Sequence, residues 1–207
     1  MDRLLDISNA VPILIALILS AAPHEMMHAL VAHRLGDDLA HSQGRISLNP
    51  LKHIDPFLTI GLPMISLLLG GGMIMAAKPV PVNTMRLRGG ENGMALVGLA
   101  GPLTNLVIAA ALAIPLNVMS GGGALYQFIQ IFFLINISLC VFNLLPIPPL
   151  DGSRALYAIA PRPVQRLMDA IEAQGLIFLF ILIFVFGSAI YPIINAGRQF
   201  LIDILIR

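Results

Sequence analysis

Charged residues are scarce in this sequence. They make up 11% of the 207 residues, and the formal net charge is only +1. A soluble globular domain carries about 25% charged residues, so the composition argues against a soluble protein. No run of lysine and arginine, and no basic patch with interleaved aromatics, supplies the positive field that nucleic-acid binding needs. We therefore expect no nucleic-acid partner.

Cysteine is almost absent as well. The chain has one cysteine, Cys140, so it has no internal disulfide and no cysteine-rich metal site. Because Cys140 lies within an apolar stretch, we expect a buried, inert thiol.

Apolar residues dominate what remains. They make up 57% of the sequence, and the mean hydropathy is +0.89. Apolar stretches of about 20 residues recur, each long enough to cross a hydrocarbon core of about 30 Å. The sequence predicts an all-α polytopic membrane protein with about four full transmembrane helices, near residues 8–34, 94–116, 128–145 and 176–194. We expect one domain over residues 1–207, with a core at about 8–155 and an amphipathic segment and last span at 156–207.

Residues 57–77 are apolar but poorly suited to one straight helix. Gly61, Pro63 and the run Gly70, Gly71, Gly72 interrupt them. We expect a re-entrant or broken segment, sheltered by protein or lining a wet cavity. On either side of it, alternation near residues 44–48 and the prolines of KPVPVN near 78–83 predict short β elements.

The first predicted span contains the motif PHEMMHA. His24 and His28 are four residues apart, so both imidazoles lie on one helical face and can reach one metal ion. Glu25 is placed to take a proton from a water molecule without being a ligand itself. Ionisable groups at membrane depth cost at least about 2.5 to 3.5 kcal/mol on insertion scales, which favours a metal over solvated histidines.

A catalytic zinc site needs a third protein ligand. Asp151 is the best candidate, because it follows a span directly, in a proline-rich turn with Gly152 after it. Without the other two candidate ligands, Asp151 would be interpreted as an ordinary aspartate in a turn.

HEMMH in one span and NLLPIPPLDG after a later one together resemble the site-2 protease family of intramembrane zinc metalloproteases. GRISLNPLKHIDP, AAKPVPVN and AGPLTN extend the resemblance to the compact branch without PDZ or CBS domains. The resemblance implies one Zn²⁺ per chain, bound by His24, His28 and Asp151, with Glu25 as general base and Asn143 as a substrate or oxyanion contact. It also implies transmembrane protein or peptide substrates in a bacterial or archaeal cell membrane.

Two further polar residues have open interpretations. Asn105 faces a costly membrane setting, so it bonds either to another helix or to an unwound substrate. His53, in KHIDP, either supports the site and contacts substrate or caps backbone groups of its loop.

The distribution of charge predicts the orientation. If Asp151 completes the site, the later part of residues 8–34 and the end of residues 128–145 lie near one membrane face. Most of the lysines and arginines fall on that face, whereas the turn near residues 121–123 has no charge. The positive-inside rule therefore places the active site toward the cytoplasm.

Two other classes of function compete with a protease. A metal-binding membrane transporter would use the same ligands as a transit site, but it has little use for Glu25 and shows paired halves that are not evident here. A catalytically silent membrane scaffold would not need the complete set of ligands and base.

Overall fold

The computed structural model describes residues 9–53, 79–119 and 121–206. The long helices are α1 (Ala10–Arg34), α4 (Glu91–Val118), α5 (Gly123–Asn143) and α9 (Gly187–Leu205). The shorter ones are α2 (Leu39–Ser42), η3 (Pro50–Lys52), η5 (Thr84–Arg86), α6 (Gly152–Ile159), α7 (Arg162–Glu172) and α8 (Gly175–Phe184). This part of the chain has no β-strand, so the all-α prediction is confirmed here.

The predicted short β elements near 44–48 and 78–83 are wrong. Gly44 has φ +68° in a turn after α2, where the Arg45 N–H donates to the Ala40 carbonyl. Residues 79–83 are irregular, and the Asn83 N–H donates to Asp37 Oδ2 at 2.6 Å instead of to a partner strand. Prolines and alternation favour extended backbone, but they do not supply a neighbouring strand. The predicted re-entrant segment 57–77 and Lys78 lie outside the described residues.

Three helices, α1, α4 and α5, are long and apolar enough to cross a membrane. They correspond to the first three predicted spans. The fourth prediction, near residues 176–194, differs from the structure because the chain breaks at Val185 and Phe186, between α8 and α9. Among the described residues, a fourth span is found only if α7 and residues 177–184, which are bent by 94° relative to each other, are counted as one.

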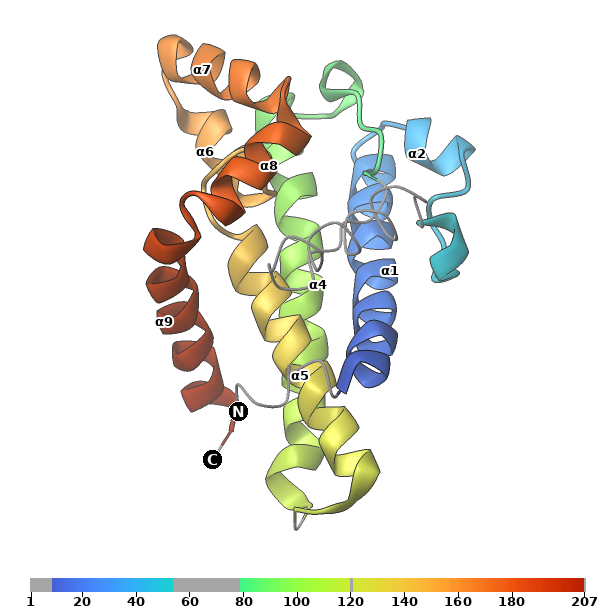
Figure 1. Cartoon of the computed structure of the whole chain (residues 1–207). Helices are drawn as coiled ribbons and strands as arrows, with labels where there is room; N and C mark the ends of the chain where they lie inside the picture. Colours follow the sequence, from blue (N-terminus) through green and yellow to red (C-terminus); the bar gives the residue numbers. More distant parts are fainter. Residues whose placement is uncertain (1–8, 54–78, 120, 207) are drawn as a thin grey trace.

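Helices α1, α4 and α5 lie side by side, with α4 in contact with α1, α5 and α6 (Figure 1). Helices α4 and α5 form an antiparallel hairpin, whose turn is at the lower end of Figure 1. The C-terminal end of α1 and the N-terminal end of α4 lie at the opposite end, together with α6 and α7. Helix α9 runs beside α5.

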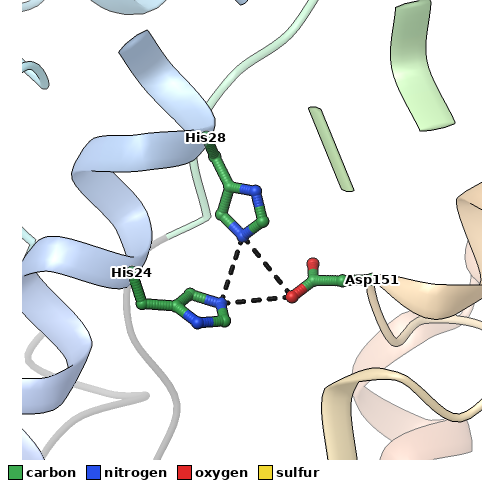
Figure 2. A group of neighbouring side chains, drawn as sticks. All are labelled: His24, His28 and Asp151. Atoms are coloured by element: carbon green, nitrogen blue, oxygen red, sulfur yellow. Dashed lines mark hydrogen bonds and ion pairs between the residues drawn. The ribbon is translucent and has the colours of Figure 1, made fainter. Parts of the chain in front are cut away.

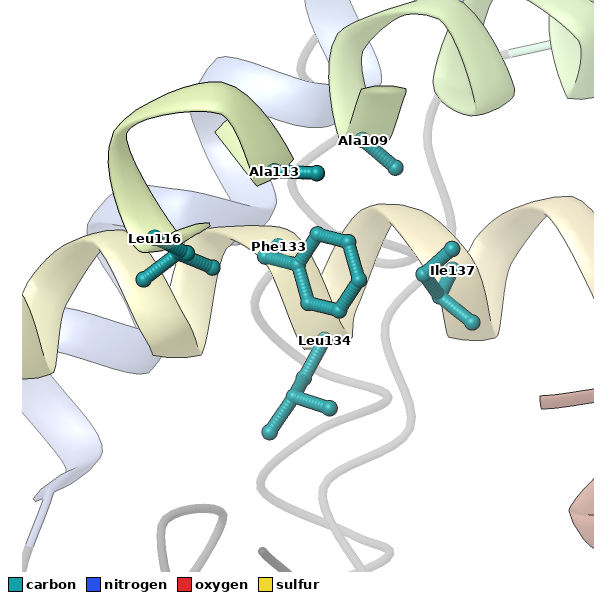
Figure 3. Packing of buried hydrophobic residues seen from close by; sticks show 6 residues of the cluster. All are labelled: Ala109, Ala113, Leu116, Phe133, Leu134 and Ile137. Atoms are coloured by element: carbon teal, nitrogen blue, oxygen red, sulfur yellow. The ribbon is translucent and has the colours of Figure 1, made fainter. Parts of the chain in front are cut away.

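Small residues let α4 and α5 pack closely. Ala109 and Ala113 of α4 lie against Phe133, Leu134 and Ile137 of α5, all buried (Figure 3). The short side chains of the alanines bring the two backbones close together, so van der Waals contacts stabilise this pair of helices.

Candidate metal centre

Both histidines of the HEMMH motif lie on one buried face of α1. His24 and His28 are one helical turn apart, and their ring centroids are 4.7 Å apart in an edge-to-face arrangement. The His24 Nε2 atom is 3.1 Å from the His28 Nε2 atom. The i, i+4 spacing thus brings two potential ligand atoms together, as the helical period requires.

Asp151 reaches the histidines from the turn after α5. Prolines at 146, 148 and 149 prevent that helix from continuing, and Asp151 lies directly before α6. Its Oδ2 atom is 3.1 Å from His24 Nε2 and 3.4 Å from His28 Nε2 (Figure 2). The turn is tight, since a Cβ on Gly152 would collide with the Leu144 carbonyl oxygen. The three ligand atoms all lie within 4.8 Å of one another.

The far nitrogen of each imidazole has a hydrogen-bond acceptor. His28 Nδ1 is 2.7 Å from the Val97 carbonyl oxygen, and His24 Nδ1 is 2.5 Å from Asn105 Oδ1. A neutral imidazole with its proton on Nδ1 has a bare lone pair on Nε2. These two partners therefore assign both protons to Nδ1 and direct both Nε2 lone pairs toward Asp151.

This donor set fits a zinc ion. Two imidazole lone pairs and a carboxylate oxygen face one another, and such an arrangement needs a cation between them, either a proton or a metal. Gly101 of α4 leaves the necessary space, because a Cβ there would lie 2.6 Å from His24 Nε2 and collide with His28 Nε2. Two histidines and a carboxylate, with a position left for water, are typical of catalytic zinc sites.

Asp151 is held in the charged form that a metal ligand needs. When a proton instead of a metal ion lies between these groups, burial alone would raise the pKa of this carboxyl, but the charge of a protonated His28 and hydrogen bonds from the imidazoles outweigh that effect. The pKa of Asp151 therefore lies well below its ordinary value.

Glu25 lies beside these three residues. It follows His24 on α1, is partly exposed, and interacts electrostatically with His28, His24 and Asp151. His53 also acts electrostatically on Glu25. A carboxylate in this position is free to accept a proton next to the metal centre.

The three residues predicted to contact substrate have different surroundings in the structure. Asn143 is the last residue of α5, partly exposed, and its Nδ2 donates to the Leu139 carbonyl at 3.0 Å. His53 is buried, and its Nε2 donates to the Ser47 carbonyl at 2.8 Å. Asn105 is fully buried and bonds to His24, so it lies behind a proposed ligand. Substrate contacts by Asn105, Asn143 and His53 stay predictions.

Two buried polar residues near the site, Asn136 and Ser20, were not predicted from the sequence. Asn136 of α5 bonds to both Asn105 and Ser20, and Ser20 lies one turn before His24 on the same face of α1. A signal was available for each. Ser20, His24 and His28 repeat every four residues, and Asn136 interrupts an apolar span as Asn105 does.

A second group of potential ligands lies at the C-terminal end of α1. His33, Asp38 and His41 also have ligand atoms within 4.8 Å of one another. Asp38 and His41 are exposed, and His33 Nδ1 is 2.6 Å from Asp38 Oδ1. We name this group the surface cluster.

Comparisons with known proteins point in one direction. Residues 120–187 match Peptidase family M50, a range that includes Asp151 but not the histidine motif. Three relatives carry the name "Putative zinc metalloprotease", with the designations YwhC (Bacillus subtilis), Rip2 (Mycolicibacterium smegmatis) and MJ0611 (Methanocaldococcus jannaschii).

The Bacillus relative is similar over almost the whole chain. It is 39% identical over 96% of this chain and 94% of its own length. The mycobacterial protein is 33% identical over 80% of this chain and 64% of its own length. The Methanocaldococcus protein is 37% identical over 64% of this chain and 62% of its own length. No solved structure was found to match.

Proposed function

This chain belongs to peptidase family M50 and is a zinc metalloprotease, and we propose that it hydrolyses peptide bonds within the membrane. In this proposal His24, His28 and Asp151 bind one zinc ion, and Glu25 is the general base.

The main support for the proposal is that the Nε2 lone pairs of His24 and His28 both point toward Asp151. Both Nδ1 atoms have acceptors, Val97 O and Asn105 Oδ1, so both Nε2 atoms are available to a metal. Asp151 Oδ2 lies within 3.4 Å of each of them. Hydrogen-bonded outer partners of this kind orient metal-binding histidines and raise their basicity.

Hydrolysis then needs no covalent intermediate. Zinc, when bound, supplies Lewis-acid chemistry that polarises a carbonyl and lowers the pKa of a water molecule toward about 7. Glu25 accepts the proton of the attacking water and delivers it to the leaving amine. General acid–base catalysis of this kind contributes about 10²- to 10⁴-fold to the rate.

The position of the site in the bundle favours substrates that are themselves membrane segments. His24 lies ten residues before the end of α1, about 15 Å along the helix axis, in a helix long enough to span a bilayer. A peptide bond cleaved there comes from a transmembrane substrate, whose helix must unwind to expose its carbonyl.

The charge distribution favours an active site toward the cytoplasm. The end of the bundle that carries α6 and α7 is rich in arginine, whereas the turn between α4 and α5 has no charge (Figure 1). The arginines and lysine of the described loops and helices at this end are Arg34, Arg45, Lys52, Arg86, Arg88, Arg154, Arg162 and Arg166. By the positive-inside rule, such an end faces the cytoplasm.

The test is cleavage of tagged single-span substrates by detergent-purified protein, with the zinc content of each sample measured. Wild type, Glu25→Gln and Asp151→Ala are compared. We expect cleavage by wild type alone, with zinc retained in Glu25→Gln and reduced in Asp151→Ala.

Other outcomes would contradict the proposal in different ways. Equal cleavage by wild type and Glu25→Gln would remove Glu25 as the base. Undiminished zinc in Asp151→Ala would remove Asp151 as a ligand.

A further inference from the structure

Three fully buried polar side chains from three helices form one hydrogen-bonded chain that ends at His24. Ser20 lies on α1, Asn105 on α4 and Asn136 on α5, and none of them is exposed. We call this set the polar relay. Buried polar groups are costly unless all are bonded, so a relay of three in an apolar bundle calls for an explanation.

Every hydrogen bond in the polar relay has a defined direction. The Ser20 hydroxyl donates to the Ala16 carbonyl at 2.7 Å, which leaves its oxygen as an acceptor. Asn136 Nδ2 donates to Ser20 Oγ at 2.9 Å and to the carbonyl of Phe132 at 2.9 Å. Both amide protons of Asn136 are then used, and its Oδ1 is the remaining acceptor.

Asn105 transmits this direction to the metal centre. Its Nδ2 donates to Asn136 Oδ1 at 2.9 Å, so the other end of its amide, Oδ1, must face His24. His24 Nδ1 is 2.5 Å from that oxygen and therefore carries the proton. In the opposite orientation the Asn105 amide nitrogen would donate to His24 Nδ1, which would move the imidazole proton to Nε2, and Asn136 Oδ1 would face an oxygen instead of a donor.

We propose that the polar relay fixes the tautomer and ring orientation of His24, so that Ser20, Asn105 and Asn136 are positioning residues for the metal centre. This inference rests on the proposed role of His24 as a ligand. It also distinguishes the two histidines. His28 is oriented by a backbone carbonyl, whereas His24 depends on side chains from two other helices.

The first test is the zinc dissociation constant, measured in detergent by competition with a chromogenic chelator. Removing a hydrogen-bonded outer partner typically weakens metal binding by about 10- to 100-fold, and we expect this for Asn105→Leu. Asn136→Leu should weaken zinc binding less, and it should add nothing to Asn105→Leu, because the relay is already broken there. The matched controls are Thr104→Val and Ser138→Ala, whose hydroxyls donate to the Ala100 and Leu134 carbonyls of their own helices. Neither should change zinc binding.

The second test detects the hydrogen bond between the polar relay and His24 by NMR, in protein labelled with ¹⁵N-histidine and loaded with zinc. We expect a hydrogen-bonded proton on His24 Nδ1, assigned by its loss in His24→Ala. Its resonance should move in Asn136→Leu, or in the milder Ser20→Ala if the leucine variant does not fold, although neither residue contacts His24. It should not move in Ser138→Ala.

The results separate this inference from the proposed function. If His24→Ala loses zinc but Asn105→Leu binds it as tightly as wild type, the relay proposal is wrong and the ligand assignment stands. A wild-type His24 without a bonded Nδ1 proton would also overturn the relay. If His24→Ala keeps its zinc, the ligand assignment itself fails.

Discussion

Helix α1 contributes to two groups that each contain two histidines and one aspartate. The candidate metal centre consists of His24, His28 and Asp151, and the surface cluster consists of His33, Asp38 and His41. In both groups the ligand atoms lie within 4.8 Å of one another. By residue type and distance alone the two groups are equivalent.

Their surroundings differ. In the surface cluster, His33 Nδ1 bonds to Asp38, and the His33 and His41 rings face each other at 4.4 Å with a tilt of 33°. The aspartate there orients a histidine, whereas in the metal centre Asn105 and a backbone carbonyl do so and the aspartate meets the Nε2 atoms. Outer partners and burial, more than the number of donors, therefore distinguish the candidate metal centre from the surface cluster.

Replacing one histidine from each group is the strongest test of this difference. His28→Ala and His33→Ala remove the same side chain from the same helix. We expect His28→Ala to lose more than about 100-fold in zinc affinity, because loss of a ligand exceeds the 10- to 100-fold effect of an outer partner. We expect His33→Ala to match wild type. Zinc content after gel filtration and chelator competition measure both, and loss of zinc from His33→Ala would abolish the distinction.

A second test fills the space at the metal centre without removing any ligand. In Gly101→Ala the new methyl group would meet His24 Nε2 at 2.6 Å, so the imidazoles must move apart. Overpacking costs about 1 to 3 kcal/mol, and if this cost falls on the metal-bound state it is equivalent to roughly 5- to 150-fold in zinc affinity.

Gly187→Ala is the control for this test, since a Cβ at Gly187 meets nothing within 4 Å. Chelator competition should show unchanged zinc binding in Gly187→Ala. Equal affinities for the two alanine variants would mean that the space beside Gly101 is not where the metal binds.

The sequence predicted the parts of this molecule that depend on local periodicity. The spacing of His24 and His28 requires adjacency on a helix, and the apolar runs located α1, α4 and α5. Gly98, Gly101 and Asn105 follow one another at spacings of three and four residues, which places them near one face of a helix. In the structure a Cβ on Gly98 would lie 2.7 Å from the Asp151 carbonyl oxygen, so α4 does pack against the segment that carries Asp151.

Features that depend on how the helices are rotated against one another could not be predicted in this way. The polar relay forms only because Ser20, Asn105 and Asn136 meet at one point between three helices. The break between α8 and α9 was not predicted either. Residues 176–194 are apolar on both sides of this break, and amino-acid composition alone gives no information about a bend. The predicted β elements were wrong because the part of the chain that the structure describes offers them no partner strands.

The smallest expected effect concerns the surface cluster alone. Asp38→Asn keeps an oxygen that can accept the hydrogen bond from His33 Nδ1 and removes only the charge. Exposed charges interact through solvent of high dielectric constant, so such pairs contribute about 0 to 1 kcal/mol. We therefore expect the free energy of unfolding, measured in detergent, to change by no more than about 1 kcal/mol. The zinc content should stay at the wild-type level. A large fall in either quantity would show that the two groups are coupled through the last turns of α1, and that the surface cluster supports the metal centre instead of merely resembling it.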